Sequence, residues 1–89
     1  MVRIRFTSLL GQRMGGISSV EVAAETVASA LRALTDGYPA VTRLVWAEEN
    51  VLNPMMAVFL NNRLLIAAEL DAAVKEGDEI EIVPAVSGG

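Results

Sequence analysis

One short segment of the chain repeats its apolar residues with the period of an α-helix. Positions i, i+3, i+4 and i+7 of this segment carry aliphatic side chains that share one helix face: Val27, Ala30, Leu31 and Leu34. Such a stripe must be buried against another layer of structure.

The helix has clear start and stop signals. Thr26 can act as the N-cap, although no Glu or Gln three residues later completes a capping box. The segment Asp36-Gly37-Tyr38-Pro39 predicts its end, because Gly37 can adopt the left-handed conformation and Pro39 cannot continue the hydrogen-bond ladder.

Alternating apolar and polar residues predict strands on both sides of the helix. Five segments have strand character: Val2 to Phe6, Ile17 to Val22, Met55 to Leu60, Leu64 to Ile66 and Ile80 to Val83. The glycine-rich stretch Gly11 to Gly16 is interpreted as the loop of a hairpin between the first two strands. It resembles no phosphate-binding loop, because no Gly-Lys-Ser/Thr follows it.

The connections in the second half of the chain are predicted from turn residues. Asn61-Asn62 and Lys75-Glu76-Gly77-Asp78 are expected to form tight turns, with Gly77 at the permissive position. A short helical turn is expected between Pro39 and Val45. Trp46 to Asn50 is interpreted as a loop in which Trp46 is a partly buried anchor rather than a binding aromatic.

These elements predict one α+β domain over residues 1–84, followed by a flexible tail over residues 85–89. The expected fold is a mixed sheet of four to five strands with one main helix packed on one face. Inward residues of the terminal strands should bury against the helix stripe, with Leu70 and Val74 adding to the core: Val2, Ile4, Phe6, Ile80 and Ile82. The other face of the sheet is then free.

Composition excludes several classes of function. The chain has no cysteine and no histidine, so thiolate chemistry, disulfides and the commonest general base and metal ligands are absent, and we predict neither catalytic nor metal-binding residues. Its net charge of −4 disfavours nucleic-acid binding.

No apolar run is long enough for a membrane span and no signal peptide is evident, so we expect a cytoplasmic protein. We also expect it to be monomeric when free.

The printed sequence ends in Gly88-Gly89, directly after the predicted last strand, Pro84 and a short connection. Glycine has no Cβ, so two terminal glycines can thread a narrow channel and present the main-chain carboxylate to another enzyme. The alternative is a frayed terminus without a function.

With its terminal Val-Pro-Ala-Val-Ser-Gly-Gly, this arrangement resembles the ubiquitin-like sulfur-carrier proteins. That group includes the small subunit of molybdopterin synthase, the thiamine-pathway carrier and the carriers of cysteine biosynthesis. The resemblance extends from the Val2 strand through the Thr26-Val27 helix start and the Asn61-Asn62 turn to Glu76-Gly77-Asp78. Ala85 stands where the molybdopterin type often has a second proline, which favours the cysteine-pathway carriers, and the long connection from Trp46 to Pro54 disfavours the thiamine type.

The resemblance implies a β-grasp fold and a specific chemistry. A partner adenylating (E1-like) enzyme would use ATP and magnesium to activate Gly89, whose carboxylate becomes a thiocarboxylate. Val86, Ser87 and Gly88 would thread into that partner. Sulfur would then pass to an acceptor enzyme such as a molybdopterin synthase large subunit or a cysteine synthase, so this chain would bind no cofactor and would act as a co-substrate.

Partner docking is expected on the free sheet face, where alternation places five side chains together: Arg3, Arg5, Phe59, Glu81 and Val83. Phe59 is the best anchor candidate because aromatic residues often carry interface energy. The alternative for the charges is an ordinary solvated face with cross-strand pairs such as Arg5 and Glu81. Two other functions stay open at this point: a protein modifier joined through Gly89 to lysines, and a non-covalent binding module.

Overall fold

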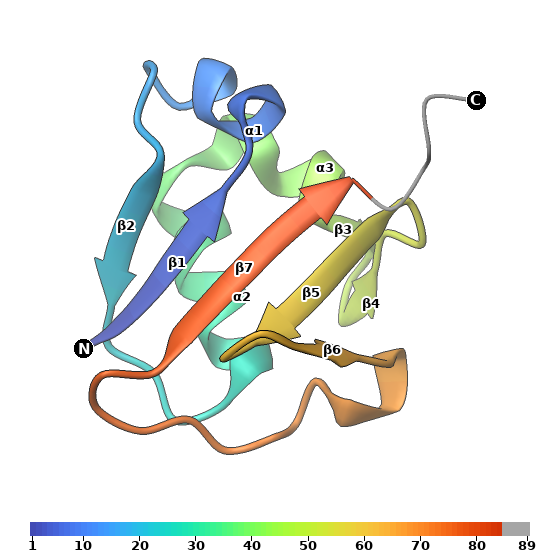
Figure 1. Cartoon of the computed structure of the whole chain (residues 1–89). Helices are drawn as coiled ribbons and strands as arrows, with labels where there is room; N and C mark the ends of the chain where they lie inside the picture. Colours follow the sequence, from blue (N-terminus) through green and yellow to red (C-terminus); the bar gives the residue numbers. More distant parts are fainter. Residues whose placement is uncertain (85–89) are drawn as a thin grey trace.

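A computed structural model describes residues 1–84 and shows a five-stranded sheet with its helices on one side (Figure 1). The strand order is β2-β1-β7-β5-β6. The central pair β1 and β7 is parallel, and the other three pairs are antiparallel. The bounds are β1 Val2–Phe6, β2 Ser19–Val22, β5 Met56–Leu60, β6 Arg63–Leu65 and β7 Glu79–Pro84. The predicted mixed sheet with one main helix is confirmed.

Helix α2, Val27–Gly37, lies across the inner face of the sheet as the apolar stripe predicts. Thr26 is its N-cap, and its Oγ1 accepts the backbone N–H of Ser29 at 3.0 Å. The Ser29 hydroxyl in turn accepts the backbone N–H of Thr26 at 3.0 Å. The expectation that the capping box is missing was therefore wrong, because serine supplies the reciprocal bond that Glu or Gln usually makes.

The end of α2 differs from the prediction at Gly37. This glycine is the last residue of the helix and is not among the residues with positive φ. The backbone N–H of Tyr38 donates to the Leu34 carbonyl at 2.9 Å, so the last turn closes without a left-handed residue. Pro39 then starts the short 3-10 helix η1, Pro39–Val41, which runs into α3, Thr42–Val45, and this confirms the predicted helical turn.

The connection between β1 and β2 contains a helix, so the predicted hairpin loop at Gly11 to Gly16 was wrong. Helix α1 spans Ser8–Arg13. Leu10 and Met14 are buried in the core, and their i, i+4 spacing brings them to one side of this helical segment. Only Gly15 and Gly16 keep the positive φ angles expected of a turn.

Trp46 to Asn50 was predicted as a loop, but it forms most of a small hairpin. Strand β3, Trp46–Glu48, pairs with β4, Val51–Leu52, in a separate two-stranded sheet. Asn50 turns the chain with φ 64°. Trp46 is buried, as expected of an anchor residue.

Tight turns hold the strands of the main sheet as the sequence predicts. Asn61 and Asn62 have φ of 48° and 72° between β5 and β6, and Gly77 has φ 89° before β7. The carboxylate of Asp78 braces both turns, since it accepts the Lys75 backbone N–H at 2.9 Å and the Asn61 side-chain amide at 3.1 Å. A 3-10 turn, η2 at Ala67–Glu69, follows β6.

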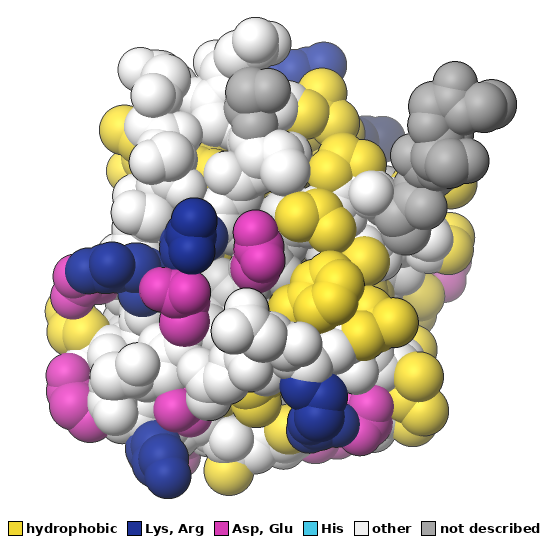
Figure 2. All heavy atoms as spheres, viewed as in Figure 1, with side chains coloured by type: hydrophobic (Ala, Val, Ile, Leu, Met, Phe, Trp, Pro, Cys, Tyr) yellow, Lys and Arg dark blue, Asp and Glu magenta, His cyan; other side chains and the backbone are white. Residues whose placement is uncertain are grey.

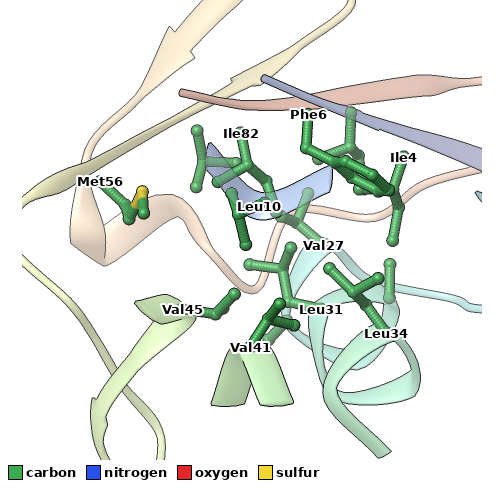
Figure 3. Packing of buried hydrophobic residues seen from close by; sticks show 14 of the residues in the cluster. Ile4, Phe6, Leu10, Val27, Leu31, Leu34, Val41, Val45, Met56 and Ile82 are labelled. Carbon is green, nitrogen blue, oxygen red and sulfur yellow. The ribbon is translucent and has the colours of Figure 1, made fainter. Parts of the chain in front are cut away.

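The core lies between the sheet and the helices (Figure 3). Inward residues of the parallel centre of the sheet meet the stripe of α2, and the fully buried members include Ile4, Val27, Leu31, Ile80 and Ile82. Leu70 joins this cluster and Val74 packs against it from an irregular segment, as expected. Among residues 1–84, no helix is both long and apolar enough to cross a membrane.

Candidate docking face

The outer face of the sheet, on the side opposite α2, brings the five predicted docking residues together. In the register between β1 and β7, Arg5 lies opposite Glu81, and in the register between β7 and β5, Glu81 lies opposite Phe59. Val83 lies opposite Ala57 in the register of β7 and β5. Arg3 lies two residues before Arg5 on β1, so their side chains share one face. Residues in register point to the same side of a sheet. We call this surface the docking face.

The charged half of the docking face lies over β1 and β2 (Figure 2). Arg3 forms an ion pair with Glu21 at 3.6 Å, and Arg5 forms one with Glu79 at 3.3 Å. The predicted pair of Arg5 with Glu81 is therefore wrong, because the arginine reaches diagonally to the previous outward residue of β7. Among residues 1–84, Glu81 has no ion-pair partner. The docking face thus presents one carboxylate, that of Glu81, that forms no ion pair among the described residues.

The apolar half of the docking face covers β5, β6 and the end of β7, where hydrophobic side chains gather in Figure 2. Half-buried Phe59 lies opposite Leu64, which is 53% exposed. Ala57 and Val83 extend the same half toward the end of β7. Leu64 and Ala57 were not among the predicted docking residues. The sequence signal that could have identified Leu64 is the apolar run Leu64-Leu65-Ile66, because successive residues of a strand point to opposite faces and one of the two leucines must face outward.

The turn after β6 is held by an exposed carboxylate. Glu69 accepts the backbone N–H of Ile66 at 2.9 Å and the Arg63 guanidinium at 3.0 Å. The Ile66 N–H, and after it the Arg63 side chain, hold the pKa of Glu69 below its ordinary value. These contacts fix the edge of the sheet next to Leu64.

Strand β7 leads from the centre of the sheet to the last described residue. Pro84 is still in register, opposite Met56, so pairing continues to the expected domain boundary at residue 84. The residues predicted to thread into a partner and to be activated lie outside the described part of the chain: Val86, Ser87, Gly88 and Gly89.

The side chains of the docking face are suited to binding another protein. An apolar area beside a single carboxylate suits a partner that offers an apolar patch and a cation. Within residues 1–84, no three His, Cys, Asp or Glu side chains are grouped so that they could hold a metal ion.

Comparison with known sequences gives one family and one curated relative. The model of the ThiS family matches residues 12–89. A protein of Archaeoglobus fulgidus described as a "Putative sulfur carrier protein" is 46% identical over 39 residues, which is 43% of this chain. The matched stretch spans only 44% of the length of that relative.

Solved structures of other proteins resemble this one over nearly the whole chain. Small archaeal modifier protein 1 of Methanosarcina acetivorans superimposes with a TM-score of 0.87 at 26% identity, over 99% of this chain and 95% of that one. A chain of the Amycolatopsis orientalis BexX/CysO complex superimposes with a TM-score of 0.85 at 28% identity, over 100% of both chains. These likenesses confirm the predicted β-grasp, ubiquitin-like fold.

Proposed function

The chain belongs to the ThiS family, and from this premise we propose that it is a sulfur carrier whose Gly89 carboxylate is activated and converted to a thiocarboxylate. The observation that carries the proposal is the family match over residues 12–89, which includes Gly88-Gly89. The likeness to the Archaeoglobus fulgidus protein described as a "Putative sulfur carrier protein" and to a chain of the BexX/CysO complex supports it.

The proposed chemistry takes place in three steps. An oxygen of the Gly89 carboxylate attacks the α-phosphorus of ATP bound with magnesium on an adenylating enzyme, so an acyl adenylate forms and pyrophosphate leaves. A persulfide of the sulfur donor then attacks the acyl carbon and the bond to AMP breaks. Reductive cleavage of the resulting acyl disulfide by a thiol leaves the thiocarboxylate. Adenylation is needed because a carboxylate is a poor electrophile.

The docking face gives this proposal its recognition surface. The adenylating enzyme would contact Phe59, Leu64 and Val83 through an apolar patch and meet Glu81 with a cation. Glycines at positions 88 and 89 would let the backbone enter a channel too narrow for a Cβ. The chain acts here as a co-substrate of the adenylating enzyme.

The acceptor is the second proposed partner. Ala85 after Pro84 favours an acceptor of the cysteine-synthase kind over a molybdopterin synthase large subunit. Each purified acceptor enzyme can be assayed with the thiocarboxylated protein as its sulfur donor. The product then identifies the acceptor, because one enzyme forms cysteine and the other forms molybdopterin.

Intact-mass measurement tests the proposal. The mass of the mature protein first checks that Gly89 is its last residue. Incubation with the adenylating enzyme of the same genome, ATP, magnesium and a sulfur donor should then add the mass difference between sulfur and oxygen. Hydroxylamine added without the sulfur donor should trap the acyl adenylate as a hydroxamate. An unchanged mass under both conditions, with an active family carrier as positive control, would refute the proposal.

Matched variants separate the terminus from the docking face. Gly89→Ala should fold normally but should not be activated. Phe59→Ala should raise the KM for the carrier, whereas Val51→Ala, which removes an exposed apolar side chain of β4 outside the docking face, should change it little. Equal effects of these last two variants would contradict the proposed contact.

A second function, protein modification through an isopeptide bond to lysine, is favoured by the likeness to small archaeal modifier protein 1. Cells that produce the tagged protein should then contain larger tagged species that disappear when Gly88 and Gly89 are deleted. If only the free protein is found under conditions that preserve conjugates, the sulfur-carrier proposal stands alone.

A further inference from the structure

A groove of roughly 430 Å³ lies on the helix side of the molecule, away from the docking face. It is formed by α2, α3 and the β3–β4 hairpin, which lie on the same side of the sheet in Figure 1. Arg32 comes from α2 and Arg43 from α3, and the hairpin contributes Trp46, Asn50 and two glutamates. None of these residues has a part in the proposed sulfur transfer.

The guanidinium of Arg32 is held in a defined orientation in this groove. It lies over the ring of Trp46, with 5.7 Å between the guanidinium carbon and the ring centroid. It also donates to the side-chain oxygen of Asn50, whose left-handed backbone turns the hairpin at this point. A guanidinium has five N–H donors in a planar fork, so these two contacts orient it and leave most of its donors available.

Two donor groups that line the groove have no partner among the described residues. The indole N–H of Trp46 is buried and finds no hydrogen-bond acceptor among the described residues, in a side chain that is only 9% exposed. Arg43 has no ion-pair partner within residues 1–84. Together with the available N–H groups of Arg32, the unpaired guanidinium of Arg43 suits the groove to a group that brings acceptor atoms.

The residues of the groove also indicate the chemical class of its ligand. A carboxylate matches the planar fork of an arginine with two parallel hydrogen bonds. Glu48 and Glu49 also line the groove, and their charge opposes a ligand with two or more negative charges. The Trp46 ring supplies an apolar wall for the rest of the ligand.

We propose that this groove binds a monocarboxylate with an apolar body, in which the carboxylate pairs with Arg32 and Arg43 and the body lies against the hairpin. The same chemistry is offered by a small aliphatic acid and by the terminal carboxylate of a peptide. The groove does not involve Gly89, so this proposal can be tested separately from the sulfur-carrier function.

The test uses the fluorescence of Trp46, the only tryptophan of the chain. The full-length protein is titrated at constant ionic strength with butyrate and with its uncharged amide, and in parallel with acetyl-Ala-Leu and the amide of that dipeptide. The acids should give a saturable change that their amides do not give. Tighter binding of the dipeptide acid identifies a peptide as the source, and tighter binding of butyrate identifies a small acid.

Variants place the binding in the groove. Arg32→Lys keeps the charge but loses the fork, and should weaken butyrate binding about tenfold, the loss expected for one charge-assisted hydrogen bond. Arg43→Gln, on a different helix, should also weaken it. Arg13→Gln removes an arginine outside the groove and should have no effect. Absence of saturation, equal binding of acid and amide, or equal effects of Arg13→Gln and Arg43→Gln would each overturn the proposal.

Discussion

Arg5 lies directly opposite Glu81 in the register of β1 and β7, yet its guanidinium pairs with Glu79 at 3.3 Å. The pair is solvent-exposed on both sides. Because the arginine turns toward the earlier glutamate, Glu81 forms no ion pair among the described residues, although Arg5 lies opposite it on one side and Phe59 on the other.

Double-mutant cycles should detect this asymmetry. The cycle of Arg5→Gln with Glu79→Gln should give a coupling energy of about 0.2–1 kcal/mol, the usual range for an exposed ion pair. The cycle of Arg5→Gln with Glu81→Gln should give a smaller value. Urea unfolding at low salt measures both, and a larger coupling for Glu81 would contradict the observed pairing.

Gly37→Ala tests the helical end of α2. This glycine has ordinary helical geometry and an added Cβ would meet nothing within 4 Å. Alanine restricts the unfolded chain more than glycine, so the substitution should raise the free energy of unfolding by about 0.5–1 kcal/mol. A loss of stability would instead indicate the left-handed conformation that the sequence suggested.

Gly11→Ala should have the opposite effect. The Cβ of an alanine at this position would overlap the backbone carbonyl oxygen of Ile17, which cannot move aside as a flexible side chain can. Strain of this kind typically costs about 1–3 kcal/mol. Thermal unfolding of Gly11→Ala and Gly37→Ala, measured side by side, should show shifts of opposite sign.

Ile82→Ala should strongly destabilise the domain. Ile82 is fully buried at the centre of the sheet, and deleting such a side chain costs about 2–5 kcal/mol. Val83→Ala, one residue later on the docking face, is the matched control and should lose less. Comparable losses in urea unfolding would mean that the docking face is part of a packed core.

Asp78 should make the domain less stable in acid. The Lys75 backbone N–H, and then the Asn61 amide, hold the pKa of its carboxyl below the ordinary value in the folded state. This contribution is fully present above the unfolded pKa of about 3.9 and is lost as the pH falls through the lower folded value. Asp78→Asn should therefore lose stability at pH 7 and depend less on pH during acid unfolding. Asp71→Asn, at an exposed position, is the control, and the same pH profile for both variants would exclude this role.

The strands and α2 could be predicted because their periodic patterns agree with their burial. Val2, Ile4 and Phe6 alternate with arginines, and the helix stripe has the right spacing. Alternation alone also placed Arg3, Arg5, Phe59, Glu81 and Val83 on one face, although their role in docking is still a prediction.

The remaining elements depend on tertiary contacts that local patterns do not express. Helix α1 includes a glycine and is followed by two more, so local propensity favours a loop, and burial of Leu10 and Met14 decides otherwise. The β3–β4 hairpin is short, and its strands have only three and two residues, too few to show a period of two. The choice of Glu79 by Arg5 depends on side-chain reach, which a register does not specify.

The position of β7 determines how the domain bears a pulling force. This last strand has β1 parallel on one side and β5 antiparallel on the other. Its backbone hydrogen bonds run across the strand to both neighbours, so tension applied along the strand beyond Pro84 loads them together in shear rather than opening them one at a time. An enzyme that draws in the end of this chain would therefore pull against the whole centre of the sheet, and the domain should stay folded while its terminus is held.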